Sequence, residues 1–235
     1  MRLIKSKAIY LSLLLSLLLF SFINLKPQEN NPPVVKIISP QNNSTFDSNA
    51  PVTYKIAVSD KEDGDSKFDE INAKEVLLEV RRVTKSKSAS NKGLQSDPGL
   101  TVIMTSNCIN CHNFNSKSIG PSFYEINKKY PITKANTDTL IKRIREGSSG
   151  LWGGKEKMPT HHELTVAETK SAVQWILKNA ADPNVSYYTG LEGFFRISSA
   201  TKGIYMLTAG YTDHGLKDVP GKRLRATDVV TIQSK

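Results

Sequence analysis

Cys108-Ile109-Asn110-Cys111-His112 lies near the middle of this chain of 235 residues. A cysteine pair of this spacing, with a histidine directly after the second cysteine, is the attachment motif for a c-type haem. The two thiols add to the vinyl groups of the porphyrin, and the adjacent imidazole then lies under the iron. The chain has only these two cysteines, so a haem would use both and leave none for a disulfide. We therefore predict one covalently bound haem c, with His112 as the proximal ligand of its iron.

Two other kinds of site use closely spaced cysteines. A thioredoxin-like redox pair needs a strand-to-helix βαβ setting, and the sequence around the motif does not provide one. A zinc site would need two more ligands, and His161 and His162 are the only nearby pair. Adjacent histidines rarely bind one zinc ion at finger-like spacing. Haem attachment is therefore the favoured interpretation.

Residues 1–26 have the form of a secretory signal peptide. The basic residues Arg2, Lys5 and Lys7 precede an apolar run over residues 8–25. The run is also about long enough for a short membrane helix, so an uncleaved N-terminal anchor is the alternative. In either case we expect the rest of the chain to be exported to the periplasm. Haem of the c type is attached on the outer side of the bacterial inner membrane, so the two signals agree.

The formal net charge of the chain is +10, and three of the positive charges precede the apolar run of the signal segment. The remaining charges are spread out, and no basic patch is interleaved with aromatic residues. We interpret the charge as an aid to solubility and to partner steering. We expect no nucleic-acid partner, and membrane contact only through the possible N-terminal anchor.

Short β-strands are predicted within residues 33–85. The candidates cover 34–38, 52–59 and 75–83, and the second alternates cleanly between apolar and polar residues. Inward-facing side chains are expected at Val52, Tyr54, Ile56, Val58, Val76, Leu78 and Val80. Three strands bury too little surface to be stable alone, so they suggest part of a β-sandwich.

The segment from Asp60 to Asp65 is dense in acidic residues. Such a segment could bind calcium, but it does not contain the full set of ligands of a calcium loop. We favour an exposed turn.

Helical periodicity replaces the alternation over residues 97–183. Asp97 and Pro98 form an N-terminal cap, and we expect the haem motif to lie on the helix that they begin. A middle helix is predicted to be capped by Asn136 and to end at Gly147.

The last predicted helix begins at a capping box formed by Thr165 and Glu168. Its apolar face is predicted to consist of Val166, Val173, Ile176, Leu177 and Ala180.

The second axial ligand of the iron must come from the side of the haem opposite His112. Met158, followed by Pro159, lies in a glycine-rich loop and is our prediction; Met1, Met104 and Met206 are poorly placed. His161 is the competing ligand, with His162 beside it. A thioether favours ferrous iron and raises the reduction potential, whereas histidine leaves it lower.

A set of motifs in fixed order covers residues 97–183. It comprises Cys108-x-x-Cys111-His112, Gly120-Pro121, Gly150-Leu-Trp152-Gly153, Met158-Pro159 and Trp175-Ile-Leu. In this set the chain resembles the small bacterial class I cytochromes c.

The resemblance implies roles for several residues. The carbonyl of Pro121 would accept a hydrogen bond from the proximal imidazole, which fixes the orientation of the ring. Trp152 would lie near a haem propionate, while Trp175 would pack the last helix against the first. Iron with two protein ligands has no open position for oxygen or peroxide, so we expect an electron-transfer protein and not an enzyme.

Residues 190–235 again have the pattern of strands, with candidates at 194–197, 203–213 and 229–232. The pattern Gly-x-Tyr-x-Leu-x-Ala-x-Tyr-x-Asp, which begins at Gly203, resembles the penultimate strand of immunoglobulin-like modules, where the first tyrosine forms a corner. His214 follows in a turn and is expected to face solvent.

We therefore predict a mixed two-domain fold. An all-α cytochrome c domain (94–183) is inserted into an all-β immunoglobulin-like sandwich built from the discontinuous segments 33–85 and 190–235. The arrangement resembles cytochrome c modules associated with periplasmic quinoprotein sugar dehydrogenases. The resemblance implies a redox partner protein, either a dehydrogenase or a terminal oxidase.

Two other functions stay open at this point. One is a haem enzyme or gas sensor with a labile sixth ligand, which would use His161 or His162 on the distal side. The other is a β-sandwich that binds a glycan or a protein and carries the haem as an accessory group.

Overall fold

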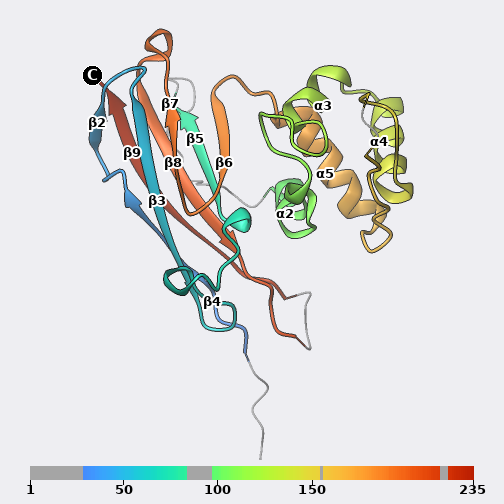
Figure 1. Cartoon of the computed structure of the whole chain (residues 1–235), viewed down its shortest axis with the longest axis horizontal. Helices are drawn as coiled ribbons and strands as arrows, with labels where there is room; N and C mark the ends of the chain where they lie inside the picture. Colours follow the sequence, from blue (N-terminus) through green and yellow to red (C-terminus); the bar gives the residue numbers. More distant parts are fainter. Residues whose placement is uncertain (1–28, 84–96, 154–155, 218–221) are drawn as a thin grey trace, which may run out of the picture.

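The computed structural model describes residues 29–83, 97–153, 156–217 and 222–235. A strand-rich part and a helical part lie side by side (Figure 1). The expected signal or anchor at 1–26 falls outside the described residues, and so does the junction between the predicted segments 33–85 and 94–183. No helix in the described part of the chain combines the length and the apolar character that a bilayer crossing requires.

The first sheet is built around the long strand β3 (Pro51–Asp60). Alternation along β3 places Val52, Tyr54, Ile56 and Val58 on its buried face, as predicted. β3 pairs in antiparallel fashion with β1 (Val34–Ser39), β4 (Gly64–Asp65) and β7 (Glu192–Arg196).

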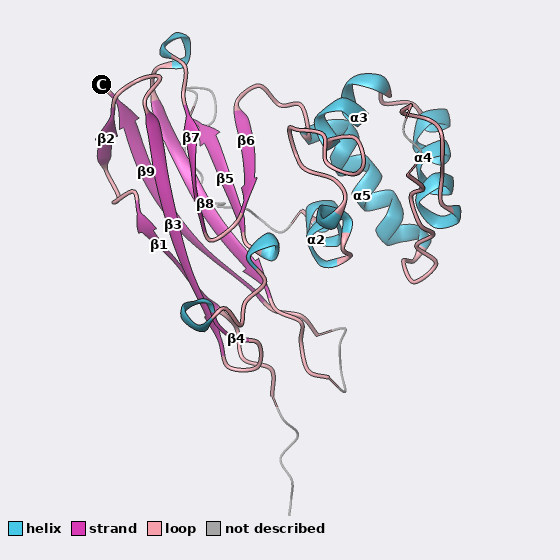
Figure 2. Cartoon of the chain, viewed as in Figure 1, coloured by secondary structure: helices cyan, strands magenta, loops and turns pink. Residues whose placement is uncertain are grey.

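The second sheet joins strands that lie far apart in the sequence. Its strands are β2 (Ser44–Phe46), β5 (Leu77–Arg82), β6 (Val185–Thr189), β8 (Ile204–Thr212) and β9 (Arg225–Ser234). Their spatial order is β2-β9-β8-β5-β6, in which β2 runs parallel to β9 and the other pairs are antiparallel. β5 precedes the helices in the sequence, whereas its two neighbours follow them. The chain therefore returns to the same sheet after the helical part (Figure 2).

The two sheets share one hydrophobic core, to which Val58, Leu78 and Leu207 contribute fully buried side chains. Because side chains alternate along a strand, Leu77 and Glu79 of β5 point to the opposite face of their sheet. They are nevertheless only 1% and 4% exposed. The helical part covers this face, and Leu77 belongs to its hydrophobic cluster.

The helical part is organised around helix α2 (Pro98–Thr105), which packs against helix α5 (Val166–Asn179). Asp97 caps α2, and the predicted capping box of Thr165 and Glu168 is present at the start of α5. The remaining elements are the 3-10 turn η3 (Cys108–Asn110), α3 (Phe123–Lys129) and α4 (Lys134–Glu146), which ends at Gly147 as predicted.

The haem motif does not lie on the first helix, which corrects the prediction. α2 ends at Thr105, and Asn107 adopts a left-handed conformation with a φ of 60°. The motif then begins the separate turn η3. Serine and asparagine compete for backbone hydrogen bonds, and asparagine tolerates the left-handed conformation, so the Ser106-Asn107 pair interrupts the helix.

The middle helix is capped by Thr133, not by the predicted Asn136. The Thr133 hydroxyl accepts a hydrogen bond from the Asn136 backbone N–H, and the Asn136 side chain donates to the carbonyl of Pro131. In α5, Val166 is 58% exposed and is not part of the apolar face, because it is the first residue of the helix. The other members of the predicted face are buried: Val173, Ile176, Leu177 and Ala180.

β6 is a strand that the sequence pattern did not predict, because it falls between the predicted cytochrome domain (94–183) and the second predicted strand segment (190–235). The segment Val-Ser-Tyr-Tyr-Thr is nevertheless rich in residue types that favour strands. It pairs with β5, with Tyr187 opposite Glu79.

Candidate haem attachment site

The imidazole of His112 is held by the backbone of the loop that follows it. Its Nδ1 lies 2.6 Å from the carbonyl oxygen of Pro121, the contact that the resemblance implies. A carbonyl can only accept, so Nδ1 carries the proton and donates. Nε2 is then the nitrogen that remains to bind a metal.

Gly120 lets this loop approach the imidazole closely. A Cβ atom at this position would lie 2.5 Å from Cε1 and 2.8 Å from Nδ1 of His112. The N–H of Gly120 also donates to the carbonyl of Cys111, at 2.8 Å. The Gly120-Pro121 pair therefore combines two properties that the site needs: space beside the ring, and a carbonyl directed at Nδ1.

The face of the imidazole packs on Phe123, with ring centroids 5.6 Å apart and an angle of 23° between the planes. Phe123 was not among the predicted site residues. The available signal for it in the sequence is its position two residues after Pro121. Burial lowers the pKa of His112, although the hydrogen bond to Pro121 acts in the opposite direction. The ring is therefore neutral at neutral pH, which is the form that binds iron.

The turn η3 keeps the two thiols and the imidazole on one compact segment. The N–H groups of Cys111 and His112 both donate to the carbonyl of Cys108, at 3.2 Å and 2.9 Å. Both cysteines are free and partly buried. Burial raises the pKa of the Cys108 thiol to about 11. A thioredoxin-like pair needs a cysteine with a lowered pKa, so this environment does not suit that alternative.

Met158 lies on the segment between α4 and α5. It forms a two-residue bridge with Ser148, in which each N–H donates to the other carbonyl, at 2.9 Å and 3.2 Å. Gly147 makes the bridge possible, because its φ is +80° and a Cβ there would lie 2.8 Å from the Met158 carbonyl oxygen. The backbone of Met158 is thus fixed relative to the end of α4, while its side chain is half-buried.

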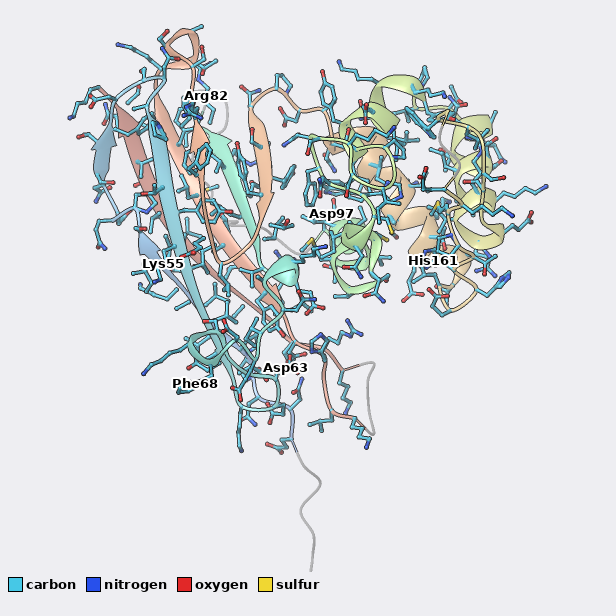
Figure 3. The ribbon with its side chains drawn as sticks, viewed as in Figure 1. Lys55, Asp63, Phe68, Arg82, Asp97 and His161 are labelled. Atoms are coloured by element: carbon cyan, nitrogen blue, oxygen red, sulfur yellow. The ribbon has the colours of Figure 1, made fainter. Side chains whose placement is uncertain are left out.

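His161, the competing ligand, lies on the same segment in the helical part (Figure 3). Its N–H donates to the carbonyl of Ile144 at 3.0 Å, and its Nδ1 lies 2.7 Å from a carboxylate oxygen of Glu163. His162 is exposed. Glu163 therefore holds Nδ1 of His161, whereas this contact does not involve Nε2.

Trp152 lies beside the cationic side chain of Lys129. The ammonium of Lys129 is 4.1 Å from the centroid of a Trp152 ring, and Tyr130 meets the indole edge-on. Arg143 in turn donates a hydrogen bond to the Tyr130 hydroxyl at 2.6 Å. A positive environment suits the carboxylate of a haem propionate, the group that the resemblance would place near Trp152.

Trp175 lies where the first and last helices of this part cross, and it is 2% exposed. Gly99 allows the close approach, because a Cβ there would lie 2.1 Å from the Ser171 carbonyl oxygen and 2.6 Å from the Cβ of Trp175. Trp175 thus packs α5 against α2, as expected.

The acidic segment at 60–65 is a hydrogen-bonded turn at the end of the strand-rich part, where Figure 3 labels Asp63. One Asp60 oxygen accepts from the N–H groups of Glu62 and Asp63, at 2.9 Å and 2.8 Å. Asp63 in turn accepts from the Tyr211 hydroxyl at 2.8 Å. These donors engage one oxygen of Asp60 and one of Asp63, as expected of a hydrogen-bonded turn.

His214 is exposed, as expected, but its ring also bridges two carboxylates. Its Nδ1 lies 3.1 Å from Asp63 and its Nε2 lies 3.0 Å from Glu75. The contact with Glu75 raises the pKa of His214 to about 9. Both partners come from distant parts of the sequence, so no local pattern predicts this pair.

The residues around His112 fit a covalently attached haem. Two thiols are available for the porphyrin, Nε2 of the imidazole is left for the iron, and Cys108 packs against an apolar cluster that includes Ile109 and Phe114. These features define the class of haem proteins in which the cofactor is bound through thioether links.

The chain belongs to the cytochrome c family, whose model matches residues 96–180. A cytochrome c-552 of Hydrogenobacter thermophilus is 39% identical over 70 residues, which cover 30% of this chain and 69% of that protein. A cytochrome c-551 of Azotobacter vinelandii is 36% identical over 81 residues, which cover 34% of this chain and 96% of that protein. The crystal structure of Nitrosomonas europaea cytochrome c552 is 33% identical and covers 34% of this chain and 96% of that one, with a TM-score of 0.32.

The family binds haem c covalently, and this chain is a cytochrome c-type electron-transfer haem protein. The strand-rich part lies outside the matched residues. When bound, the haem supplies a one-electron redox centre, and the chain supplies its attachment, its ligands and its surroundings.

Proposed function

We propose that this chain is an exported, periplasmic electron carrier in which haem c is attached to Cys108 and Cys111 and the iron is bound by His112 and Met158. The single observation that carries the proposal is that Pro121 holds Nδ1 of the His112 imidazole, which leaves Nε2 as the nitrogen that would bind the iron. The fixed backbone of Met158 supports its choice as the second ligand.

With two strong protein ligands the iron has no open coordination position. Electron transfer would then take place through the edge of the haem, and the protein would set the reduction potential and control access. This role favours an electron carrier over a haem enzyme or a gas sensor.

The experiment that tests the ligation compares Met158→Ala with His161→Ala. We expect the wild-type ferric protein to show the weak far-red absorption band of a sulfur-to-iron bond. Met158→Ala should abolish the band and lower the reduction potential, whereas His161→Ala should retain both. If the wild type lacks the band, or binds carbon monoxide readily when reduced, the proposed ligation and the carrier role are wrong.

The proposed partner is a redox protein, either a dehydrogenase that donates electrons or a terminal oxidase that accepts them. The resemblance to modules associated with quinoprotein sugar dehydrogenases favours the dehydrogenase. Purification of the native protein from its own periplasm tests this, with haem reduction followed after sugar is added. A fraction in which no sugar reduces the haem would contradict the dehydrogenase.

We further propose that the strand-rich part is one immunoglobulin-like sandwich into which the cytochrome domain is inserted. Tyr205, the first tyrosine of the strand pattern, donates its hydroxyl to the carbonyl of Thr201, four residues upstream, as a tyrosine corner does. The pairing of β5 with β6 and β8 supports a discontinuous domain. With β6 included, its second segment begins near Val185 and not at residue 190.

A further inference from the structure

A row of aromatic rings runs from His112 toward the strand-rich part of the molecule. Phe123 stacks on the imidazole, and Phe114 meets Phe123 edge-on with centroids 5.4 Å apart. Tyr187 then stacks on Phe114, with centroids 5.0 Å apart and an angle of 29° between the planes. Trp175 meets Phe114, Phe123 and Tyr187 edge-on and closes the group. We call these five side chains the aromatic row.

Tyr187 differs from the other members of the aromatic row because it belongs to the strand β6. Its backbone is held by the pairing with β5, in which it lies opposite Glu79. The side chain is 6% exposed, and the Tyr187 carbonyl accepts a hydrogen bond from Asn115 of the helical part. The strand-rich part thus holds the outermost ring of the row in a fixed place.

We propose that Tyr187 is a positioning residue for His112: by supporting Phe114 and Phe123, it sets the rotation of the imidazole about its bond to the iron. The inference rests on the proposed ligation of the iron by His112. Pro121 holds the imidazole at one edge, through the hydrogen bond to Nδ1. Phe123 restricts the tilt at the face of the ring.

Protein interiors are close-packed, so a ring keeps its position only while its neighbours keep theirs. Truncating Tyr187 leaves a cavity beside Phe114, and the surrounding side chains relax partly into it. A shift of Phe114 would displace Phe123, and a shift of Phe123 would displace the imidazole. Groups that orient a metal-bound histidine also tune the metal, so the change must reach the haem.

The test uses the full-length protein with haem attached and three variants, Tyr187→Ala, Tyr187→Phe and Tyr188→Ala. Tyr188 provides the matched control, because it is the next residue of β6 and packs on the other side, near Tyr54 and Phe195. The measured quantity is the pattern of the haem methyl resonances in the proton spectrum of the ferric protein, which depends on the orientation of the axial imidazole.

We expect Tyr187→Ala to change the spread of the haem methyl resonances. Tyr187→Phe keeps the ring and should reproduce the wild-type pattern. Tyr188→Ala should leave the pattern unchanged even where it lowers the unfolding temperature. If Tyr187→Ala does not fold, Tyr187→Leu retains volume without a ring and should show the same change.

An unchanged pattern in the folded Tyr187 variants overturns the inference, and so does an equal change in Tyr188→Ala. A wild-type protein that shows no histidine-ligated, low-spin haem would instead overturn the proposed ligation. The wild-type spectrum therefore separates a failure of the ligand assignment from a failure of the positioning role.

Discussion

His214 illustrates how single side chains link distant parts of the chain. It joins the acidic turn at Asp63 to Glu75, which lies just before β5. Arg223 lies near the same place and donates a hydrogen bond to the Thr105 carbonyl, where α2 ends. The sequence predicts a solvent-facing histidine here but carries no local signal for its pairing with Asp63 and Glu75.

The raised pKa of His214 predicts a pH dependence of stability. A group whose pKa is about 9 in the folded protein and 6.5 in the unfolded chain stabilises the fold fully below about pH 6.5. The contribution is lost as the pH rises through 9. We expect the unfolding temperature of the wild type to fall over this range, and that of His214→Gln to fall less.

The control for this prediction is Glu75→Gln, which removes the charge that contributes most to the shift. It should also flatten the profile. Parallel profiles for the wild type and both variants would show that His214 titrates equally in the folded and unfolded states.

The elements of the helical part were predicted well where their signals are local. The capping box of Thr165 and Glu168 and the glycine that ends α4 need only a few neighbouring residues to form. The end of α2 was missed because a left-handed Asn107 interrupts an otherwise helical pattern. β6 was missed because it lies at the junction between the two predicted domains.

Removal of the haem should affect the helices more than the strands. The double variant Cys108→Ser with Cys111→Ser cannot attach the cofactor, around which the helices of such a domain pack. We expect this variant to lose most of its helical circular dichroism and to retain the strand signal, because the strands have their own core. A well-folded helical part without haem would contradict the prediction.

At the level of the whole molecule, the helical part covers one face of the second sheet. Leu77 and Tyr187 from the strands belong to the same hydrophobic cluster as Trp175 and Ile176 of α5. The two parts are therefore joined by buried surface as well as by the two chain segments that connect them. Fully burying a side chain such as Leu77 contributes about 1.5–3 kcal/mol, so the contact stabilises both parts.

This arrangement predicts how fragments behave. Residues 94–183 should fold alone once haem is attached, whereas residues 27–92 should not fold alone, since they lack β6 to β9. Joining 27–85 to 185–235 through a short flexible linker should restore a cooperative β domain that contains no haem. Its free energy of unfolding should be lower than in the intact chain, because Leu77 and Tyr187 become exposed.

The measurement is chemical unfolding of each fragment, followed by circular dichroism. Cooperative unfolding of 27–92 by itself would show that the early strands form an independent unit. A disordered joined fragment would show that the strands depend on the helical part. Either result would refute the discontinuous domain.

The haem attachment segment, the helix caps and the alternating strands follow from the order of residue types, since each depends on groups within a few positions of one another. Cys108, Cys111 and His112 could be predicted as the attachment residues for this reason. The pairing of β5 with β6 and β8, the bridge made by His214 and the packing of Tyr187 toward His112 join residues that are tens to more than a hundred positions apart in the chain. Such contacts depend on which faces the folded elements bury against each other, and local periodicity carries no information about that choice.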